Sequence, residues 1–334
     1  MRALRRAVAV AGLSALVAGG LVTLAEQPAS AAGVDFYVAP ASASPAGNDT
    51  PTCGPSATPC RTVAYAYARA AESDIINIRP GTYLMNAAAV AGTPVANTNT
   101  NRLSLTKSMT IRKDPASVGT VVLDGGPSAV NSPIITLATV GKSLTLIDLT
   151  LQDGFGSFGG AITLGNGTGT TVNATDVVYL NHLGIVGGAI DVGNTATYTQ
   201  TGGSFTGNTA GATTNGGLGG AVFVTGRVGA AGVPGSASFT NVTFTGNRAL
   251  GGPTANTGNG GALWNAGLLS VSGSTFGTNG ALQGTAGTIR GFGGAIFNGA
   301  LDGDDAPSLT VSSTTINGGL PSGTPAFSTN ATHG

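Results

Sequence analysis

The chain has 334 residues and a formal net charge of zero, and only 8% of its residues are Asp, Glu, Lys or Arg. Helical globular domains carry about 25% charged residues, so this composition excludes a fold built from solvent-facing helices. It also argues against a basic surface of the kind that binds nucleic acid or anionic lipid. Hydrophobic residues make up 41% of the chain, which is enough to bury a core and argues against disorder.

Residues 1–31 are predicted to be an export signal. Arginines lie near the start, an apolar stretch follows over residues 7–25, and Ala29-Ser30-Ala31 forms a small-residue cleavage site. We therefore expect an extracellular protein, secreted or associated with the cell surface, exported by the Sec or the twin-arginine route. The apolar stretch approaches the length of a spanning helix, so an uncleaved signal that contacts the membrane is the alternative.

Residues 32–102 are predicted to form a lead-in and a cap. Residues 36–38 are a strand candidate, and residues 61–72 form the convincing helix outside the signal. Residues 74–83 alternate between apolar and polar like a strand, and Pro80-Gly81 interrupts them.

Cys53 and Cys60 are the only cysteines of the chain. In an exported protein, two cysteines this close in sequence are expected to form one disulfide that closes a short loop. A disulfide that closes a loop of this length would stabilise the folded chain by roughly 2–3 kcal/mol in the chain-entropy model. Neither histidine lies nearby in sequence, which argues against a metal site at this pair.

Residues 103–320 are predicted to be one short strand after another, followed by a C-terminal tail at residues 321–334. The first strand candidates are residues 103–105, 109–111, 121–123, 134–137 and 144–146. No helical pattern interrupts them.

An internal repeat decides the fold class. Gly-Gly-Ala plus an aliphatic residue recurs over residues 159–296, interleaved with Phe-x-x-Asn, at spacings near 30 residues. Helical repeats do not fit short strands, and WD40 blades carry a Trp-Asp mark that is absent. The pattern predicts an all-β fold, a single-stranded right-handed parallel β-helix (solenoid) with a short N-terminal capping helix. The repeat residues are Gly159, Gly160, Gly187, Gly188, Gly219, Gly220, Gly260, Gly261, Gly293, Gly294, Phe205, Asn208, Phe244, Asn247, Phe276 and Asn279.

Each repeat residue has a physical reason to recur. The glycines allow a tight turn with positive φ and let neighbouring coils approach closely. The phenylalanines are expected to stack as an interior ladder, and the asparagines to sit at a bend, where their amides bond from coil to coil. We expect the variable spacing to come from insertions into one loop, for instance at residues 229–236.

Two motifs resemble known families. Residues 37–83, with Ile76-Asn77-Ile78-Arg79-Pro80-Gly81-Thr82-Tyr83, look like the N-terminal cap of pectin-lyase-like β-helix proteins. The Gly-Gly-Ala-Ile and Phe-x-x-Asn pair over residues 159–296 resembles the repeats of polymorphic outer-membrane (Pmp-type) adhesins. The first resemblance implies a capped solenoid, and the second implies display at a cell surface.

Catalytic candidates are few. Carbohydrate-cleaving solenoids gather carboxylates, a base and often Ca²⁺ in one lateral groove. The weak candidates are Asp148, Asp153, Asp176, Asp191 and His182, which fall in adjacent coils but can equally be turn residues, His182 solvated at a corner. Asp302, Asp304 and Asp305 could hold Ca²⁺, although a solvated loop is the simpler interpretation. No other cofactor is expected.

The sequence favours a secreted, non-enzymatic β-helix used for surface display or adhesion. The alternative is an extracellular carbohydrate-active enzyme, a polysaccharide lyase or glycosidase, or a glycan-binding protein. We expect a monomer whose partner is an extracellular polysaccharide or another cell surface. Because acids and arginines are scarce after Gly154, the sequence predicts that the mature chain depolymerises no polysaccharide.

Overall fold

The computed structural model describes residues 33–85, 102–126, 131–211, 216–227, 232–252, 258–282, 291–299, 307–317 and 327–329. The chain divides into two units, residues 1–31 and 32–334, and the second contains all the described residues. The predicted export signal therefore lies outside the described residues and stays a prediction. Within the described residues, no helix has the length and apolar character that crossing a membrane requires.

Nearly all the regular structure is β-strand, in four sheets that we name A to D. Sheet A contains β1 (Asp35–Val38), β2 (Ile75–Ile78), β5 (Met109–Lys113), β8 (Ser143–Ile147), β12 (Thr171–Thr175), β16 (Thr197–Thr201), β20 (Ser236–Thr240), β24 (Leu268–Ser272) and β28 (Ser308–Ser312). Sheet B contains β3 (Gly81–Leu84), β6 (Val121–Asp124), β9 (Thr150–Gln152), β13 (Val178–Leu180), β17 (Ser204–Thr206), β21 (Thr243–Thr245), β25 (Thr275–Gly277) and β29 (Thr315–Ile316). Sheet C contains β10 (Phe155–Phe158), β14 (Leu183–Val186), β18 (Thr209–Ala210), β22 (Arg248–Ala249) and β26 (Gly280–Ala281). Sheet D contains β4 (Leu103–Leu105), β7 (Ile135–Leu137), β11 (Ile162–Leu164), β15 (Ile190–Val192), β19 (Val222–Val224), β23 (Leu263–Asn265), β27 (Ile296–Asn298) and β30 (Phe327–Thr329).

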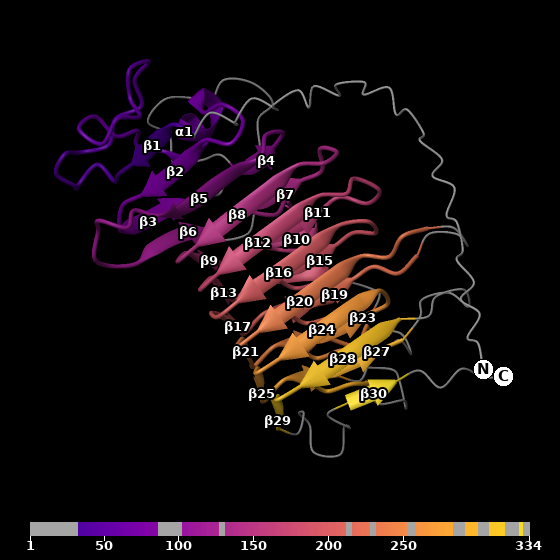
Figure 1. Ribbon diagram of the computed structural model, residues 1–334. Helices are drawn as coiled ribbons and strands as arrows, with labels where there is room; N and C mark the ends of the chain where they lie inside the picture. Colours follow the sequence, from indigo (N-terminus) through magenta and orange to yellow (C-terminus); the bar gives the residue numbers. More distant parts are fainter. Residues whose placement is uncertain are drawn as a thin grey trace, which may run out of the picture. The chain divides into compact units, whose positions relative to one another are not determined.

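The chain winds through these sheets as a right-handed parallel β-helix, and the predicted fold class is confirmed (Figure 1). One coil runs through β8, β9, β10 and β11, and the next strand, β12, pairs with β8 in parallel. Sheet B has eight strands, so the described residues form eight coils. The last of them includes β30, which lies in the segment expected to be a tail.

The predicted Phe ladder is confirmed inside the coils. Phe205, Phe244 and Phe276 occupy the same register position in sheet B and are fully buried. Their ring centroids lie 5.0 and 4.6 Å apart with the planes nearly parallel. Tyr179 continues the stack below Phe205, at 4.6 Å.

The predicted Asn ladder is also confirmed, where sheet B turns into sheet C. The side-chain Nδ2 of Asn208 donates to Oδ1 of Asn247 (2.9 Å), and Asn247 donates in the same way to Asn279 (2.9 Å). Each Nδ2 also donates to a backbone carbonyl of the preceding coil, such as Tyr179 for Asn208. All three amides are buried, so the ladder satisfies polar groups that would otherwise destabilise the corner.

The two glycines of each repeat have different roles. The first has positive φ, 60° at Gly187, a conformation that costs other residues energy. The second packs against the next coil, since a Cβ on Gly188 would lie 2.0 Å from the carbonyl oxygen of Gly220. The two predicted reasons for the repeat are therefore confirmed: the first glycine allows positive φ, and the second allows close approach of the next coil.

The expectation of one variable loop is wrong, because insertions enter at two corners. Residues 211–221 and 250–262 lengthen the turn from sheet C to sheet D, where residues 187–189 suffice in an earlier coil. Residues 225–235 lengthen the turn from sheet D to sheet A, where residues 193–196 suffice. Neither corner contributes to the ladders, which explains why both tolerate insertion.

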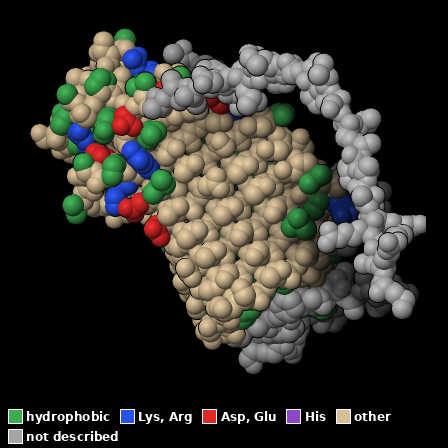
Figure 2. Space-filling model, in the orientation of Figure 1, with side chains coloured by type: hydrophobic (Ala, Val, Ile, Leu, Met, Phe, Trp, Pro, Cys, Tyr) green, Lys and Arg blue, Asp and Glu red, His purple; other side chains and the backbone are tan. Residues whose placement is uncertain are grey.

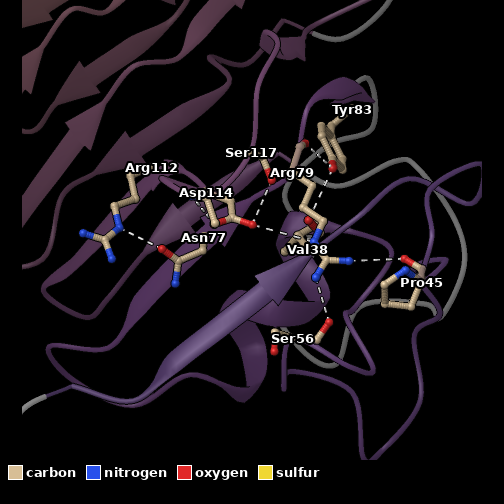
Figure 3. Close-up of polar contacts among 10 residues, drawn as sticks. Val38, Pro45, Ser56, Asn77, Arg79, Tyr83, Arg112, Asp114 and Ser117 are labelled. Atoms are coloured by element: carbon tan, nitrogen blue, oxygen red, sulfur yellow. Dashed lines mark hydrogen bonds and ion pairs between the residues drawn. The ribbon is translucent and has the colours of Figure 1, made fainter.

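The cap consists of β1 and α1 (Val63–Arg69), a helix shorter than the predicted residues 61–72. The Thr62 side chain accepts a hydrogen bond from the Tyr65 backbone N–H and so begins the helix. Cys53 and Cys60 form the predicted disulfide. Arg79 ties the cap to the first coils, because its Nη2 donates to the Ser56 carbonyl (2.8 Å) while its Nε lies 3.7 Å from Asp114 (Figure 3).

Candidate functional site

The solenoid separates the five predicted catalytic candidates onto different edges. Asp148 and Asp176 lie at the turn from sheet A to sheet B, both with φ of 53°, and both are exposed. Lys113 forms an ion pair with Asp148. The left-handed backbone conformation favours Asp or Asn, so a role as turn residues explains why Asp148 and Asp176 are aspartates.

Asp191 lies on the outward side of β15, with Thr163 and Phe223 beside it in register. Its side chain is buried and makes no hydrogen bond or ion pair to any described residue. Burial raises the pKa of Asp191 to about 7. Asp191 lies on sheet D, whereas the other four candidates lie at the turns on either side of sheet B, so it does not join them in one site.

His182 takes the place of an Asn in the ladder. The Gly154 N–H donates to its Nδ1 (2.9 Å), and its Nε2 lies 2.9 Å from the carbonyl oxygen of Leu151. Nδ1 therefore replaces an Asn Oδ1 and Nε2–H replaces an Asn Nδ2, which fixes one neutral tautomer. Burial is the main cause that lowers the pKa of His182 to about 3. The expectation of a solvated turn histidine is wrong, and both ring nitrogens are already engaged.

Asp153 lines a pocket among the described residues. The pocket has a volume of about 460 Å³ and lies where sheet B turns into sheet C. Asp124, the last residue of β6, lines it together with Asp153, which follows β9. β6 and β9 are neighbours in sheet B, so two carboxylates from consecutive coils open into one space. The remaining lining residues are Leu84, Gly126, Gly154, Phe155, Asn181 and Leu183.

The two carboxylates have different surroundings. Asp124 accepts hydrogen bonds from the Gly126 N–H (2.7 Å) and from Nε2 of Gln152 (2.9 Å). For Asp153, partial burial and then the charge of Asp124 raise the pKa above its ordinary value, while a hydrogen bond with Asn181 acts in the opposite direction. One acid is thus held as an acceptor, and its neighbour is biased toward the protonated form.

Arg102 supports the backbone behind this pocket. Its side chain is buried, and it donates from Nη1 to the Phe155 carbonyl (3.1 Å) and from Nη2 to the Gly125 carbonyl (3.3 Å). Burial lowers the pKa of Arg102. The guanidinium therefore holds the segments that follow both acids, but it does not line the pocket.

Sequence reasoning missed Asp124, Asn181 and Arg102. A signal for Asp124 was present, since Leu123-Asp124-Gly125 and Gln152-Asp153-Gly154 are both strand ends followed by a glycine. Nothing in the sequence marks Arg102, which precedes an ordinary short strand.

No metal site emerges within the described residues. The group with metal-ligand geometry there is Asp49, Cys53 and Cys60, and its cysteines are joined in the disulfide. Asp49 accepts hydrogen bonds from Thr62 and the Arg61 N–H instead. Asp302, Asp304 and Asp305, the predicted Ca²⁺ candidates, lie outside the described residues.

Comparisons with known proteins found only distant structural likenesses. No protein-family model matches the chain. No curated protein sequence matches it either. Among solved structures, the chain is similar to a crystal structure of Escherichia coli YbhC, with 12% identity and a TM-score of 0.45 over 87% of this chain and 77% of that one. It is also similar to a rhamnogalacturonan lyase, with 13% identity and a TM-score of 0.32 over 86% of this chain and 88% of that one.

Such distant likenesses assign no activity to this chain. The strand order itself defines the class of protein, a parallel β-helix. The resemblance of the cap to pectin-lyase-like proteins stays a prediction. The resemblance of the repeats to Pmp-type adhesins stays a prediction.

Proposed function

We propose that the chain is a carbohydrate-active β-helix protein whose pocket hydrolyses a glycosidic bond. The observation that carries the proposal is the pair Asp124 and Asp153, contributed by consecutive coils to one pocket. Glycoside hydrolysis uses two carboxyl groups, one protonated and one charged, on either side of the bond that breaks. Different surroundings for the two acids are what such a pair requires.

The surroundings assign the two roles. Asp153 is the general acid that protonates the leaving oxygen, because burial and the neighbouring charge favour its protonated form. Asp124, held by two donated hydrogen bonds, is the charged partner that attacks the sugar or activates water. Leu84, Phe155 and Leu183 supply apolar surface against which the carbon face of a sugar ring can pack.

The lining also favours hydrolysis of neutral glycans over β-elimination of uronates. A lyase must neutralise the uronate carboxylate and remove a proton with a base. Among the described residues, no Lys or Arg lines the pocket, and the guanidinium of Arg102 already binds two carbonyls. The charged carboxylate of Asp124 in the lining would repel an anionic sugar.

The test is to incubate the purified chain with neutral glycans (xylan, galactan, arabinan, mannan) and with acidic ones (pectate, alginate), and to follow new reducing ends and unsaturated products. We expect new reducing ends from a neutral glycan. Asp153→Asn should lower the rate at least about a hundredfold, which is the usual contribution of a general acid. Asp124→Asn should lower the rate by a similar factor. Asp176→Asn, an exposed corner acid away from the pocket, is the matched control and should keep full activity. Turnover that survives Asp153→Asn, or no product from any glycan, would overturn the proposal.

Surface display or adhesion, the first expectation from the sequence, stays a prediction that the structure does not test. The expectation that the chain cleaves no polysaccharide rested on the scarcity of acids after Gly154. Asp124 and Asp153 both precede that residue, and the pocket they line changes the balance in favour of an enzyme.

A further inference from the structure

The outward face of sheet A carries a regular array of hydroxyl groups. From β8 to β28, every strand has five residues and pairs with the next without a slip in register. Positions one, three and five of each strand point outward, and all of them are Ser or Thr except Ile147, Asn173 and Leu268. The third of these strands, β16, reads Thr197-Tyr198-Thr199-Gln200-Thr201, with both larger side chains buried.

This face lacks charge. Figure 2 shows it as a broad tan surface, with most of the visible blue and red side chains beside the cap. Exposed sheet faces ordinarily mix charged side chains of both signs, which keep proteins soluble and apart. Six consecutive strands without an outward charge therefore need an explanation beyond solvation.

The hydroxyl groups are unused within the described protein. On β12, β16 and β20, no outward Ser or Thr hydroxyl donates or accepts a hydrogen bond to a described residue. Buried groups behind them are fully bonded, since Tyr198 donates to Gln200 and Gln200 donates to the Val177 carbonyl. The face is thus backed by a rigid core and presents free donors and acceptors outward.

The geometry of the array is that of a lattice. Neighbouring strands lie about 4.8 Å apart, and outward residues on one strand about 6.7 Å apart. Threonine is stiff at χ1, so its hydroxyl and methyl groups repeat in nearly the same orientation from coil to coil. A ligand that matches this array must itself be a periodic, uncharged lattice of hydrogen-bonding groups.

We propose that the outward face of sheet A binds ice. The oxygen atoms of an ice surface form such a lattice, with repeats close to the spacing between coils. Each hydroxyl can replace a lattice water as donor and acceptor, while the threonine methyl groups occupy the spaces between waters. Because the face is rigid before it binds, little side-chain entropy is lost on docking.

A crystalline polysaccharide is the competing ligand, and the face argues against it. Sugar rings are held on protein surfaces by aromatic side chains as well as by hydrogen bonds. No aromatic side chain points outward from the sheet A strands β8, β12, β16, β20, β24 and β28. The proposal does not use the pocket and stands or falls independently of the glycosidase assignment.

The test is to grow ice slowly from a solution of the fluorescently labelled full chain and to compare its concentration in the ice with that in the remaining liquid. We expect the chain to enter the ice, whereas a globular protein of similar size is excluded. Thr199→Lys, at the centre of the face, should reduce this enrichment about tenfold, which corresponds to about 1.4 kcal/mol of binding free energy.

Thr245→Lys is the matched control, because Thr245 is a half-buried outward residue of sheet B. Circular dichroism and the thermal midpoint verify that both variants fold. Exclusion of the folded wild-type chain from ice, or equal effects of the two substitutions, would overturn the proposal. Retention on crystalline cellulose or chitin without retention in ice would also overturn it and assign the face to a polysaccharide.

Discussion

At the scale of single residues, His182 shows how a structural position can imitate a catalytic one. His182 lies one coil after Asp153 along the chain, and a histidine close to an acid suggests a general base. The structure instead gives it the hydrogen bonds of a ladder Asn, with a donor N–H on Nδ1 and an acceptor carbonyl at Nε2. The sequence predicted the Asn ladder from Asn208 onward. It did not predict that His182 is the first member, because a histidine does not match the Phe-x-x-Asn motif.

His182→Asn is therefore expected to keep both hydrogen bonds and to cost only about 1 kcal/mol at pH 7. The pKa of His182 is about 3 in the folded chain and 6.5 in the reference state, so protonation favours unfolding. Relative to His182→Asn, the wild-type chain should lose about 1.4 kcal/mol of stability per pH unit as the pH drops below 6.5. Urea denaturation between pH 7 and 4 measures this, and an identical pH profile in His182→Asn would contradict it.

Asp191 has the opposite dependence on pH. Its pKa rises from 3.8 to about 7 on folding, so the folded chain binds the proton more tightly than the unfolded chain. Its contribution to stability is full below pH 3.8 and is lost as the pH rises toward 7. Asp191→Asn imitates the neutral acid, so we expect it to be more stable than wild type at pH 7 and nearly equal at pH 4. Equal stabilities at both pH values in thermal unfolding would show that Asp191 is not buried unpaired.

At the scale of the elements, the repeats were readable because each coil places like residues above like residues. The Phe, Asn and Gly-Gly positions keep their register from β13 to β27, so residues that recur at regular spacing in the sequence stack on one another in the structure. The helix was less readable, since the capping bond of Thr62 and the extended backbone of Ala70 limit it to residues 63–69. The insertion corners were not predictable, because either turn beside sheet D can lengthen without disturbing a ladder.

The Phe column yields a prediction of its own. Phe244 is fully buried, is stacked between Phe205 and Phe276, and forms a T-shaped pair with Phe239. Phe244→Ala should leave a cavity and cost about 3–5 kcal/mol. Phe244→Leu, which fills part of the space, should cost less, and the free energy of unfolding by urea compares the two. A loss below about 1 kcal/mol in Phe244→Ala would be too small for a residue in the core.

At the scale of the whole molecule, winding creates the candidate site. Asp124 and Asp153 lie a full coil apart in sequence and meet because β6 and β9 pair in parallel. Sequence reasoning grouped the acids by adjacent coils, but membership in a coil does not say which corner a residue occupies. Asp148 and Asp153 belong to one coil and Asp191 to the next, and yet the three lie at separate places, so only the register could select the pair.

The central claim, that Asp124 and Asp153 act on each other in one pocket, is tested most directly by an NMR titration of the Asp153 side-chain carboxyl. In the wild-type chain we expect a pKa above that of an ordinary aspartate, because the site is partly buried and Asp124 is charged beside it. In Asp124→Asn the neighbouring charge is gone, so the pKa of Asp153 should fall toward its ordinary value, while Asp176→Asn should leave it unchanged. An Asp153 pKa that is ordinary in the wild type, or that does not respond to Asp124→Asn, would contradict the paired site and the hydrolytic function built on it.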